Sequence, residues 1–295
     1  MRITVTGASG FIGRRLVERL LASGHQVHCL GRSLKPGLPT SVKFSVWNPE
    51  RGSPPAPSLA EADAIIHLAG EPVAQRWTAE AKRRIRSSRV DGTRALVEGL
   101  RALEPKPRVL VSASAVGYYG HRGEELLGED SAPGHGFLAE TCIEWENEAR
   151  QAETLGVRVA MIRTGLALGK NGGVLAKLAP PFRLGLGGPL GDGTHWMPWV
   201  HLDDLCGIYQ WAMERDEVRG AVNGCAPHPV RNREFATALG RALGRPAILP
   251  VPRLAVRLLF GEMSELLFMS QRVEHRAGLS FQFADLANAL KDVLA

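Results

Sequence analysis

The sequence has little that would place it in a membrane or outside the cell. No apolar run approaches the ~18 residues that a membrane-spanning helix needs. The first strand-like segment begins at Arg2, which leaves no room for a signal peptide. We therefore expect a cytoplasmic protein with no membrane partner.

Cysteine is scarce, and charge of one sign is not concentrated. The four cysteines form no CxxC pair, which argues against a disulfide framework and a zinc site, so we expect reduced thiols and no metal: Cys29, Cys142, Cys206 and Cys225. The 36 basic and 30 acidic residues leave a net charge of +6 without a block of five like charges. Nucleic acid is therefore not an expected partner; a nucleic-acid binder would show a steep salt dependence.

What the sequence contains is typical of an ordinary globular protein. Its 295 residues, 44% hydrophobic and 22% charged, allow one large domain or two closely packed ones. Strands are predicted at residues 2–6, 26–30, 63–69, 107–112 and 157–163, with helices at 78–103 and 138–155. This alternation predicts an α/β fold, a Rossmann doubly wound parallel sheet.

The regular alternation of strand and helix patterns ends after Thr164. Residues 165–200 are rich in glycine and contain Trp196 and Trp199, and loops of that length are usually functional. Helices are predicted at 202–215, 231–244, 252–270 and 283–294, with no linker between them. We expect a Rossmann domain at 1–164, followed at 165–295 by a glycine-rich lid and a smaller C-terminal α+β substrate lobe that does not fold alone.

A glycine turn joins the first strand to the first helix. Gly7, Gly10 and Gly13 would bring backbone N–H groups and the positive end of the helix to one point, which suits a pyrophosphate. The alternative is a tight turn with no ligand.

The end of the second strand has no acidic residue to accept hydrogen bonds from a ribose 2′-hydroxyl. Arg32, Ser33 and Lys35 stand there instead and would suit a 2′-phosphate. We therefore expect NADP(H), the alternative being a solvated loop.

These motifs resemble the short-chain dehydrogenase/reductase superfamily and its extended, epimerase-like branch. The resemblance rests on TGASGFIG at 6–13, HLAG at 67–70 and the strand VLVSAS. More narrowly, SRVDGT at 88–93, GYYG at 117–120, FLAETCIEWE at 137–146 and FRLGLGGPLGDGTHWMPWVHLDDL at 182–205 are similar to the atypical NADP-binding "epimerase family" proteins, sometimes called family 39U.

The resemblance implies roles for individual residues. The pyrophosphate would be lined by Gly7, Ser9, Gly10, Phe11, Ile12 and Gly13. Arg32 would hold the 2′-phosphate, with Ser33 beside it. The riboses and the nicotinamide would be contacted by Leu68, Ala69, Gly70, Arg89, Ser112 and Leu166. Relatives often form a homodimer through the helices that correspond to 78–103 and 138–155.

The catalytic Tyr-x-x-x-Lys pair of the superfamily is absent. If Glu146 matches the glutamate that follows the lysine, Leu138 replaces the tyrosine and Cys142 the lysine. Neither can perform the same proton transfer. A thiol at Cys142, near Glu140, would be acidic only in a special environment, and packing is the simpler interpretation.

Ser114 and Tyr118 are the catalytic candidates that are left. We expect Ser114 to contact a substrate hydroxyl, the alternative being a serine that caps the following turn. Tyr118 or Tyr119 could donate the proton, or the two could form a packed aromatic pair. Trp196, Trp199 and His201 would form a wall over the substrate or a hinge for the lid, whereas Asp203 and Asp204 are expected to cap a helix.

The sequence therefore predicts an NADP(H)-dependent oxidoreductase or epimerase-like enzyme with an unknown small-molecule substrate. The alternative is a non-catalytic NADP(H)-binding redox sensor.

Overall fold

The computed structural model describes residues 1–170, 172–275 and 278–295. Its centre is a parallel sheet of seven strands in the order β11-β7-β5-β4-β1-β2-β3. The strands are β1 (Arg2–Thr6), β2 (Gln26–Gly31), β3 (Lys43–Val46), β4 (Ala64–His67), β5 (Val109–Ala115), β7 (Arg158–Thr164) and β11 (Gly220–Gly224). The predicted doubly wound α/β fold is confirmed.

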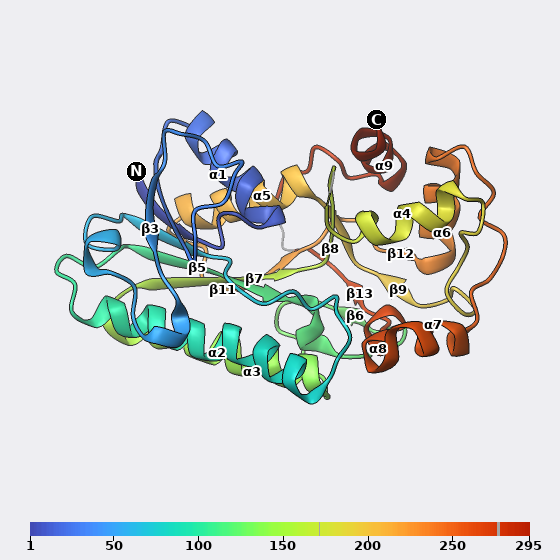
Figure 1. Cartoon of the computed structure of the whole chain (residues 1–295), viewed down its shortest axis with the longest axis horizontal. Coiled ribbons are helices and arrows are strands. Elements are labelled where there is room, and N and C mark those ends of the chain that lie inside the picture. Colours follow the sequence, from blue (N-terminus) through green and yellow to red (C-terminus); the bar gives the residue numbers. More distant parts are fainter. Residues whose placement is uncertain (171, 276–277) are drawn as a thin grey trace.

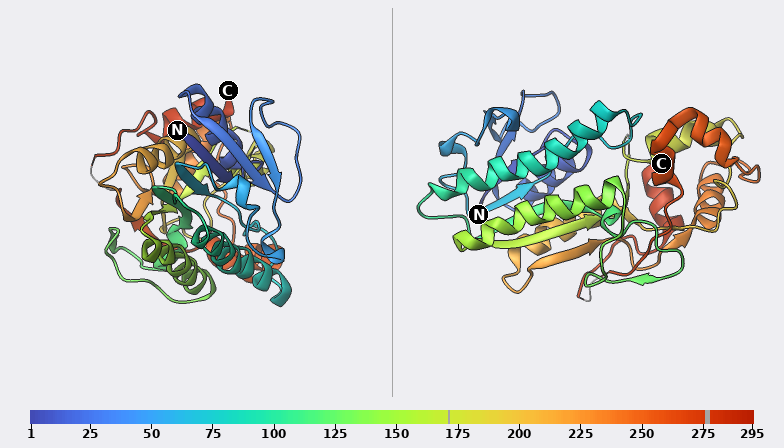
Figure 2. Two further views of the ribbon diagram at one scale, coloured as in Figure 1. Left: turned by 90° about the vertical axis from the view of Figure 1, so that its left-hand side faces the viewer. Right: turned by 90° about the horizontal axis from the view of Figure 1, so that it is seen from below.

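Helices cover both faces of this sheet (Figure 1). The helix α1 (Phe11–Ala22) packs beside α5 (Leu202–Glu214) over a buried cluster that includes Ile3, Ile66 and Val111. On the other face, α2 (Ala79–Arg101) and α3 (Phe137–Arg150) lie side by side over Ile65, Leu110 and Val159 (Figure 2). Successive side chains of a strand point to opposite faces, so the apolar runs of β4 and β5 supply both cores.

Two strands of the sheet were not predicted from the sequence. β3 is a short edge strand whose residues are partly exposed, and β11 begins and ends with glycine, so neither carries a strong apolar pattern. Both β11 and α5 come after residue 164, so the expected C-terminal segment 165–295 contributes a strand and a helix to the sheet layer.

The remaining C-terminal residues form a lobe beyond the carboxyl ends of the strands (Figure 1). Its core joins α4 (Leu175–Arg183), α6 (Asn232–Ala242) and α9 (Leu286–Leu294) around Phe182, Phe235 and Leu290. Short strand pairs complete it, which gives the lobe its α+β character: β8 (Leu166–Leu168) with β10 (Trp199–His201), β9 (Trp196–Met197) with β12 (Val230–Arg231), and β6 (Leu126–Leu127) with β13 (Arg272–Val273).

The prediction of one continuous helix at 252–270 is wrong. The chain forms α7 (Arg253–Phe260), a 3-10 turn at Gly261–Met263 and α8 (Ser264–Leu267). Gly261 has φ +62°, a left-handed conformation that ends α7. The helix predicted at 283–294 begins at Leu286, because the side chain of Asp285 accepts a hydrogen bond from the Asn288 N–H and caps it.

All four cysteines are buried as free thiols. Among the described residues, no helix combines the length and the apolar character needed to cross a bilayer.

Candidate functional site

The glycine turn after β1 lies directly against the end of β4. Gly7 has φ +67°, and a Cβ there would stand 2.7 Å from the Leu68 carbonyl. A Cβ on Gly13 would stand 2.3 Å from the oxygen of Gly7. Only glycine allows the strand, the turn and the helix to pack this closely.

The amino end of α1 is left open for an anion. Its N-cap, Gly10, provides no side-chain hydrogen bond, and its first turn has no acidic residue. The free N–H groups and the helix dipole therefore favour a phosphate at this point. The Phe11 ring packs against Gly169 and Gly172. The start of the glycine-rich segment predicted to form the lid therefore lies next to the glycine turn. Ser9 and Ile12 lie in the same turn, where the Ser9 carbonyl accepts a hydrogen bond from Arg14.

Arg32 and Ser33 lie exposed just beyond the end of β2. Within the described ranges, the Arg32 guanidinium has no hydrogen-bond or ion-pair partner of its own. Residues 19–49 contain no Asp or Glu, so this segment supplies no carboxylate that could compete for it. The donor set at this edge fits a phosphate monoester better than a ribose diol.

A buried hydrogen-bond relay fixes the loop that follows β4. The Thr6 hydroxyl oxygen accepts from the N–H groups of Leu68 and Ala69, each at 3.2 Å, and lies 2.7 Å from Nδ1 of His67. The other ring nitrogen of His67 is 3.1 Å from the Thr93 hydroxyl. Burial lowers the pKa of His67 to about 4, so the ring is neutral at pH 7. Sequence reasoning missed this relay, although both Thr6 and His67 stand in the quoted motifs.

Arg89 lies beside the same loop. Its Nη1 donates to the carbonyls of Glu71 and Ile85, and a Cβ on Gly70 would stand 3.3 Å from its guanidinium carbon. Burial lowers the pKa of Arg89. The structure thus brings Arg89 next to Leu68–Gly70, as expected of a cofactor contact, whereas the contact itself stays a prediction.

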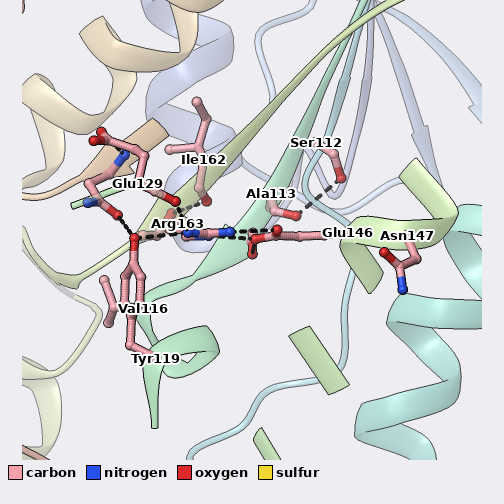
Figure 3. Close-up of polar contacts among 12 residues, drawn as sticks. Ser112, Ala113, Val116, Tyr119, Glu129, Glu146, Asn147, Ile162 and Arg163 are labelled. Carbon is pink, nitrogen blue, oxygen red and sulfur yellow. Dashed lines mark hydrogen bonds and ion pairs between the residues drawn. The ribbon is translucent and has the colours of Figure 1, made fainter. Parts of the chain in front are cut away.

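Glu146 and Arg163 form a buried ion pair (Figure 3), and Ser114 on β5 is hydrogen-bonded to it. Its hydroxyl donates to Oε1 of Glu146 at 2.7 Å. Arg163, the register partner of Ser114 on β7, donates to both oxygens of Glu146 at 2.8 and 2.9 Å. Burial alone would lower the pKa of Arg163, but the hydrogen bonds and charge of Glu146 raise it above the ordinary value. Arg163 is therefore charged and paired with Glu146.

The two tyrosines of the GYYG turn have different environments. Tyr119 is fully buried, donates to Asn223 at 2.7 Å and accepts from Arg163, and burial raises its pKa to about 12. It is therefore a structural residue. Tyr118 is half-buried, its ring centroid lies 3.5 Å from the Arg163 guanidinium carbon, and its hydroxyl forms no hydrogen bond with the described residues. Of the two, Tyr118 alone keeps a hydroxyl available for chemistry.

The α3 positions that correspond to the missing pair carry no usable acid. Leu138 and Cys142 are buried against Gly117, and burial raises the pKa of the Cys142 thiol to about 12. This supports the packing interpretation of Cys142. Glu140 is exposed and lines a surface pocket of about 570 Å³ with Lys82 and Glu262.

Ser112 and Leu166 flank this region. Ser112 is fully buried and donates to the neighbouring Ala113 carbonyl, so its hydroxyl does not reach outward. Leu166 is half-buried on β8.

The aromatic lid residues act mainly in packing. Trp199 is buried, with its indole N–H donated to the His228 carbonyl. His201 is the N-cap of α5, accepting from the Asp203 N–H. Of these three residues, Trp196 alone is half-buried, and the guanidinium carbons of Arg231 and Arg272 lie 4.5 and 5.0 Å from its ring centroid.

Asp203 and Asp204 lie in the first turn of α5, but the expectation that they cap it is wrong, because His201 is the N-cap. Both aspartates make long-range contacts instead. Asp203 pairs with Arg15 on α1. Asp204 accepts the N–H groups of Gln282 and Phe283 and so anchors the C-terminal segment. The described residues hold no group of three His, Cys, Asp or Glu side chains arranged for a metal ion.

Comparison with known families and proteins agrees with this geometry. The family model described as "NAD dependent epimerase/dehydratase family" matches residues 3–223, and one described as a domain of unknown function, DUF1731, matches residues 251–293. The chain is 39% identical to a chloroplastic SDR39U1 homologue of Arabidopsis thaliana, covering 100% of this chain and 87% of that protein. It is 37% identical to the epimerase family protein SDR39U1 of Mus musculus, with both chains fully covered.

Solved structures extend the similarity to three dimensions. Human SDR39U1 crystallised with NADPH superposes with a TM-score of 0.88 at 33% identity, covering 99% of each chain. The UDP-glucose 4-epimerase of Thermus thermophilus, in complex with NAD, gives a TM-score of 0.79 at 20% identity over 100% of this chain and 98% of the other. The second likeness shows the shared fold alone.

Proposed function

Because this chain belongs to the NAD dependent epimerase/dehydratase family, we propose that it is a cytoplasmic, NADP(H)-dependent oxidoreductase or epimerase-like enzyme. The observation that carries the proposal is the pairing of an uncapped α1 amino end with an unpaired Arg32 at the end of β2. The first suits a pyrophosphate and the second a 2′-phosphate. The NADPH bound to human SDR39U1 supports the same assignment.

The chain would hold the dinucleotide along the carboxyl edge of the sheet. The N–H groups of Phe11 to Gly13 would face the pyrophosphate, and the loop Leu68–Gly70, fixed by Thr6, would lie beside the riboses. When bound, the nicotinamide supplies a carbon that gives or takes a hydride. The protein contributes position, charge and a route for the proton.

Tyr118 is the proton donor that we propose. Its hydroxyl is free, and its ring rests on a guanidinium whose position is fixed by two carboxylate hydrogen bonds. A proton leaving the phenol would place negative charge close to this fixed cation, which is a preorganised form of stabilisation.

Ser114 would act on the substrate as an acceptor. Its own proton is committed to Glu146, so its free lone pairs can accept from a substrate hydroxyl but its hydroxyl cannot also donate to a carbonyl. In the expected contact with a substrate hydroxyl, the substrate would therefore be the hydrogen-bond donor and Ser114 the acceptor.

A panel of carbonyl compounds and sugars, assayed by NADPH consumption, tests the proposal. We expect turnover of at least one member and its loss in Tyr118→Phe, with NADPH affinity unchanged. Turnover that survives in Tyr118→Phe would assign the proton to another group, and no turnover across the panel would favour the second candidate below.

The second candidate is a non-catalytic NADP(H) sensor. The observation in its favour is the apolar filling of α3, where Leu138 and Cys142 occupy the positions of the missing Tyr and Lys. A sensor must bind NADPH and NADP⁺ with unequal affinity, because a ligand shifts an equilibrium only by its differential binding. Equal affinities would exclude it.

A further inference from the structure

The exposed apolar side chains of this protein are concentrated at one end of the C-terminal lobe. Among the described residues, eleven large hydrophobic side chains are exposed, and eight of them come from two short segments: Leu184, Leu186, Ile248, Leu249, Leu254, Leu258, Leu259 and Phe260. We call these eight the apolar patch. Single exposed leucines are ordinary, whereas a cluster of this kind marks an interaction site.

The two segments lie side by side. Leu190 forms a parallel bridge with Val251, the Gly191 N–H donates to the Val251 carbonyl, and the Arg245 side chain donates to the Arg183 carbonyl. α7 begins directly after this contact, at Arg253. Figure 1 shows α7 at the outer edge of the lobe, away from the sheet.

α7 presents its leucines to solvent. Val256 is its one buried residue, whereas Leu254 and Leu258 are 69% and 73% exposed. These two leucines are one turn apart and lie on the side of the helix opposite Val256. Leu259 is 71% exposed as well. Only the Val256 side of α7 packs against the rest of the lobe, and the leucines of the helix face solvent.

Positive charge predominates around the apolar patch, and the nearby Asp192 interacts electrostatically with one of its arginines, Arg253. Residues 154–191 and 235–261 contain no Asp or Glu. Their exposed cations beside the patch form no ion pairs within the described ranges: Arg183, Arg245, Arg253 and Arg257. The acidic residues that come next in sequence are Asp192 and Glu262, and Glu262 is paired with Lys82.

We propose that the apolar patch docks on an anionic phospholipid bilayer. Exposed leucines ringed by unpaired arginines are complementary to a surface that offers both acyl chains and negative headgroups. A second copy of the chain fits less well, because its patch would bring the same uncompensated arginines together. The expectation of no membrane partner rested on the lack of a spanning segment, which bears on crossing a bilayer and not on lying against one. The docking is independent of the proposed chemistry.

Vesicle co-sedimentation tests the proposal with the full chain at low salt. Phosphatidylcholine vesicles containing phosphatidylglycerol should bind the protein, and pure phosphatidylcholine vesicles should not. Arg253→Gln with Arg257→Gln should weaken partitioning about thirty-fold, at ~1 kcal/mol per cation near an anionic surface. Leu254→Ser with Leu258→Ser should weaken it at least ten-fold. Arg51→Gln with Arg215→Gln removes the same charge elsewhere and should retain most of the binding.

Circular dichroism and NADPH titration of each variant show whether it folds. Absence of vesicle binding by the folded wild type overturns the proposal. It is also overturned if the Arg51/Arg215 control loses as much vesicle binding as the Arg253/Arg257 variant, because the attraction would then depend on net charge alone. Sedimentation of the wild type as a dimer that the Leu254/Leu258 variant abolishes, without vesicle binding, would instead assign the apolar patch to a second copy.

Discussion

Ser114 and Glu146 are joined by a 2.7 Å hydrogen bond that commits the serine proton to a buried carboxylate. The carboxylate is held in turn by Arg163, so the residue most expected to touch substrate is fixed by the residues beneath it. Ser114 therefore keeps a fixed orientation although the neighbouring Tyr-x-x-x-Lys pair is missing.

The Glu146–Arg163 ion pair should behave as a unit in stability. Arg163→Met alone should cost about 3 kcal/mol of unfolding free energy, because it removes two of the four hydrogen bonds of a buried carboxylate and leaves it only Ser114 and the partly exposed Arg150. Adding Glu146→Leu should recover much of that loss. Denaturant unfolding of the two single variants and the double variant measures the coupling, and additive losses would contradict a mutual pair.

Arg32 should decide between the two dinucleotides. Arg32→Ala should weaken NADPH binding by about 1.5 to 3 kcal/mol, the range for a hydrogen bond to a charged group, and leave NADH binding nearly unchanged. Arg51→Ala, an exposed arginine elsewhere, serves as the control. Equal weakening of both cofactors would remove Arg32 from the 2′-phosphate site.

A glycine at position 10 should matter more for cofactor binding than for folding. A Cβ there meets only the Gly7 oxygen, at 3.1 Å, in contrast to the severe overlaps at Gly7 and Gly13. Gly10→Val should therefore fold and lose both NADPH and NADH, whereas Gly207→Val on α5 should keep both. Retained binding by a folded Gly10→Val protein would place the pyrophosphate elsewhere.

Acid should destabilise the protein through its buried histidines. Burial lowers the pKa of His67, and separately that of His195, to about 4, against 6.5 in an unfolded chain. Between these values the unfolded state binds more protons, so stability is complete above about pH 6.5 and falls as the pH drops toward 4. Each histidine contributes up to about 3 kcal/mol. Unfolding free energies at pH 7 and 4.5 should differ less in His67→Asn; an unchanged difference would count against His67.

The sequence predicted the parts of the site that depend on local pattern. The glycine turn, the strand ends and the basic residues after β2 follow from spacing and position along the chain. It could not predict the relay among Thr6, His67 and Thr93, or the pairing of Glu146 with Arg163. These residues come from distant segments, and their contacts exist only once the strand order is known.

The prediction of one continuous helix at 252–270 was wrong for a related reason. Its apolar residues recur at helical spacing, but Gly261 adopts a left-handed conformation and α7 turns its leucines to solvent. Periodicity shows that a segment has an apolar face and does not show what covers that face.

Titration of the purified protein with NADPH, NADP⁺ and NADH, followed by tryptophan fluorescence, tests the central assignment most directly. We expect saturable binding of NADPH and NADP⁺ and binding of NADH at least ten-fold weaker, in line with one charged hydrogen bond at Arg32. Absence of binding by any dinucleotide, or equal binding of NADPH and NADH, would contradict it.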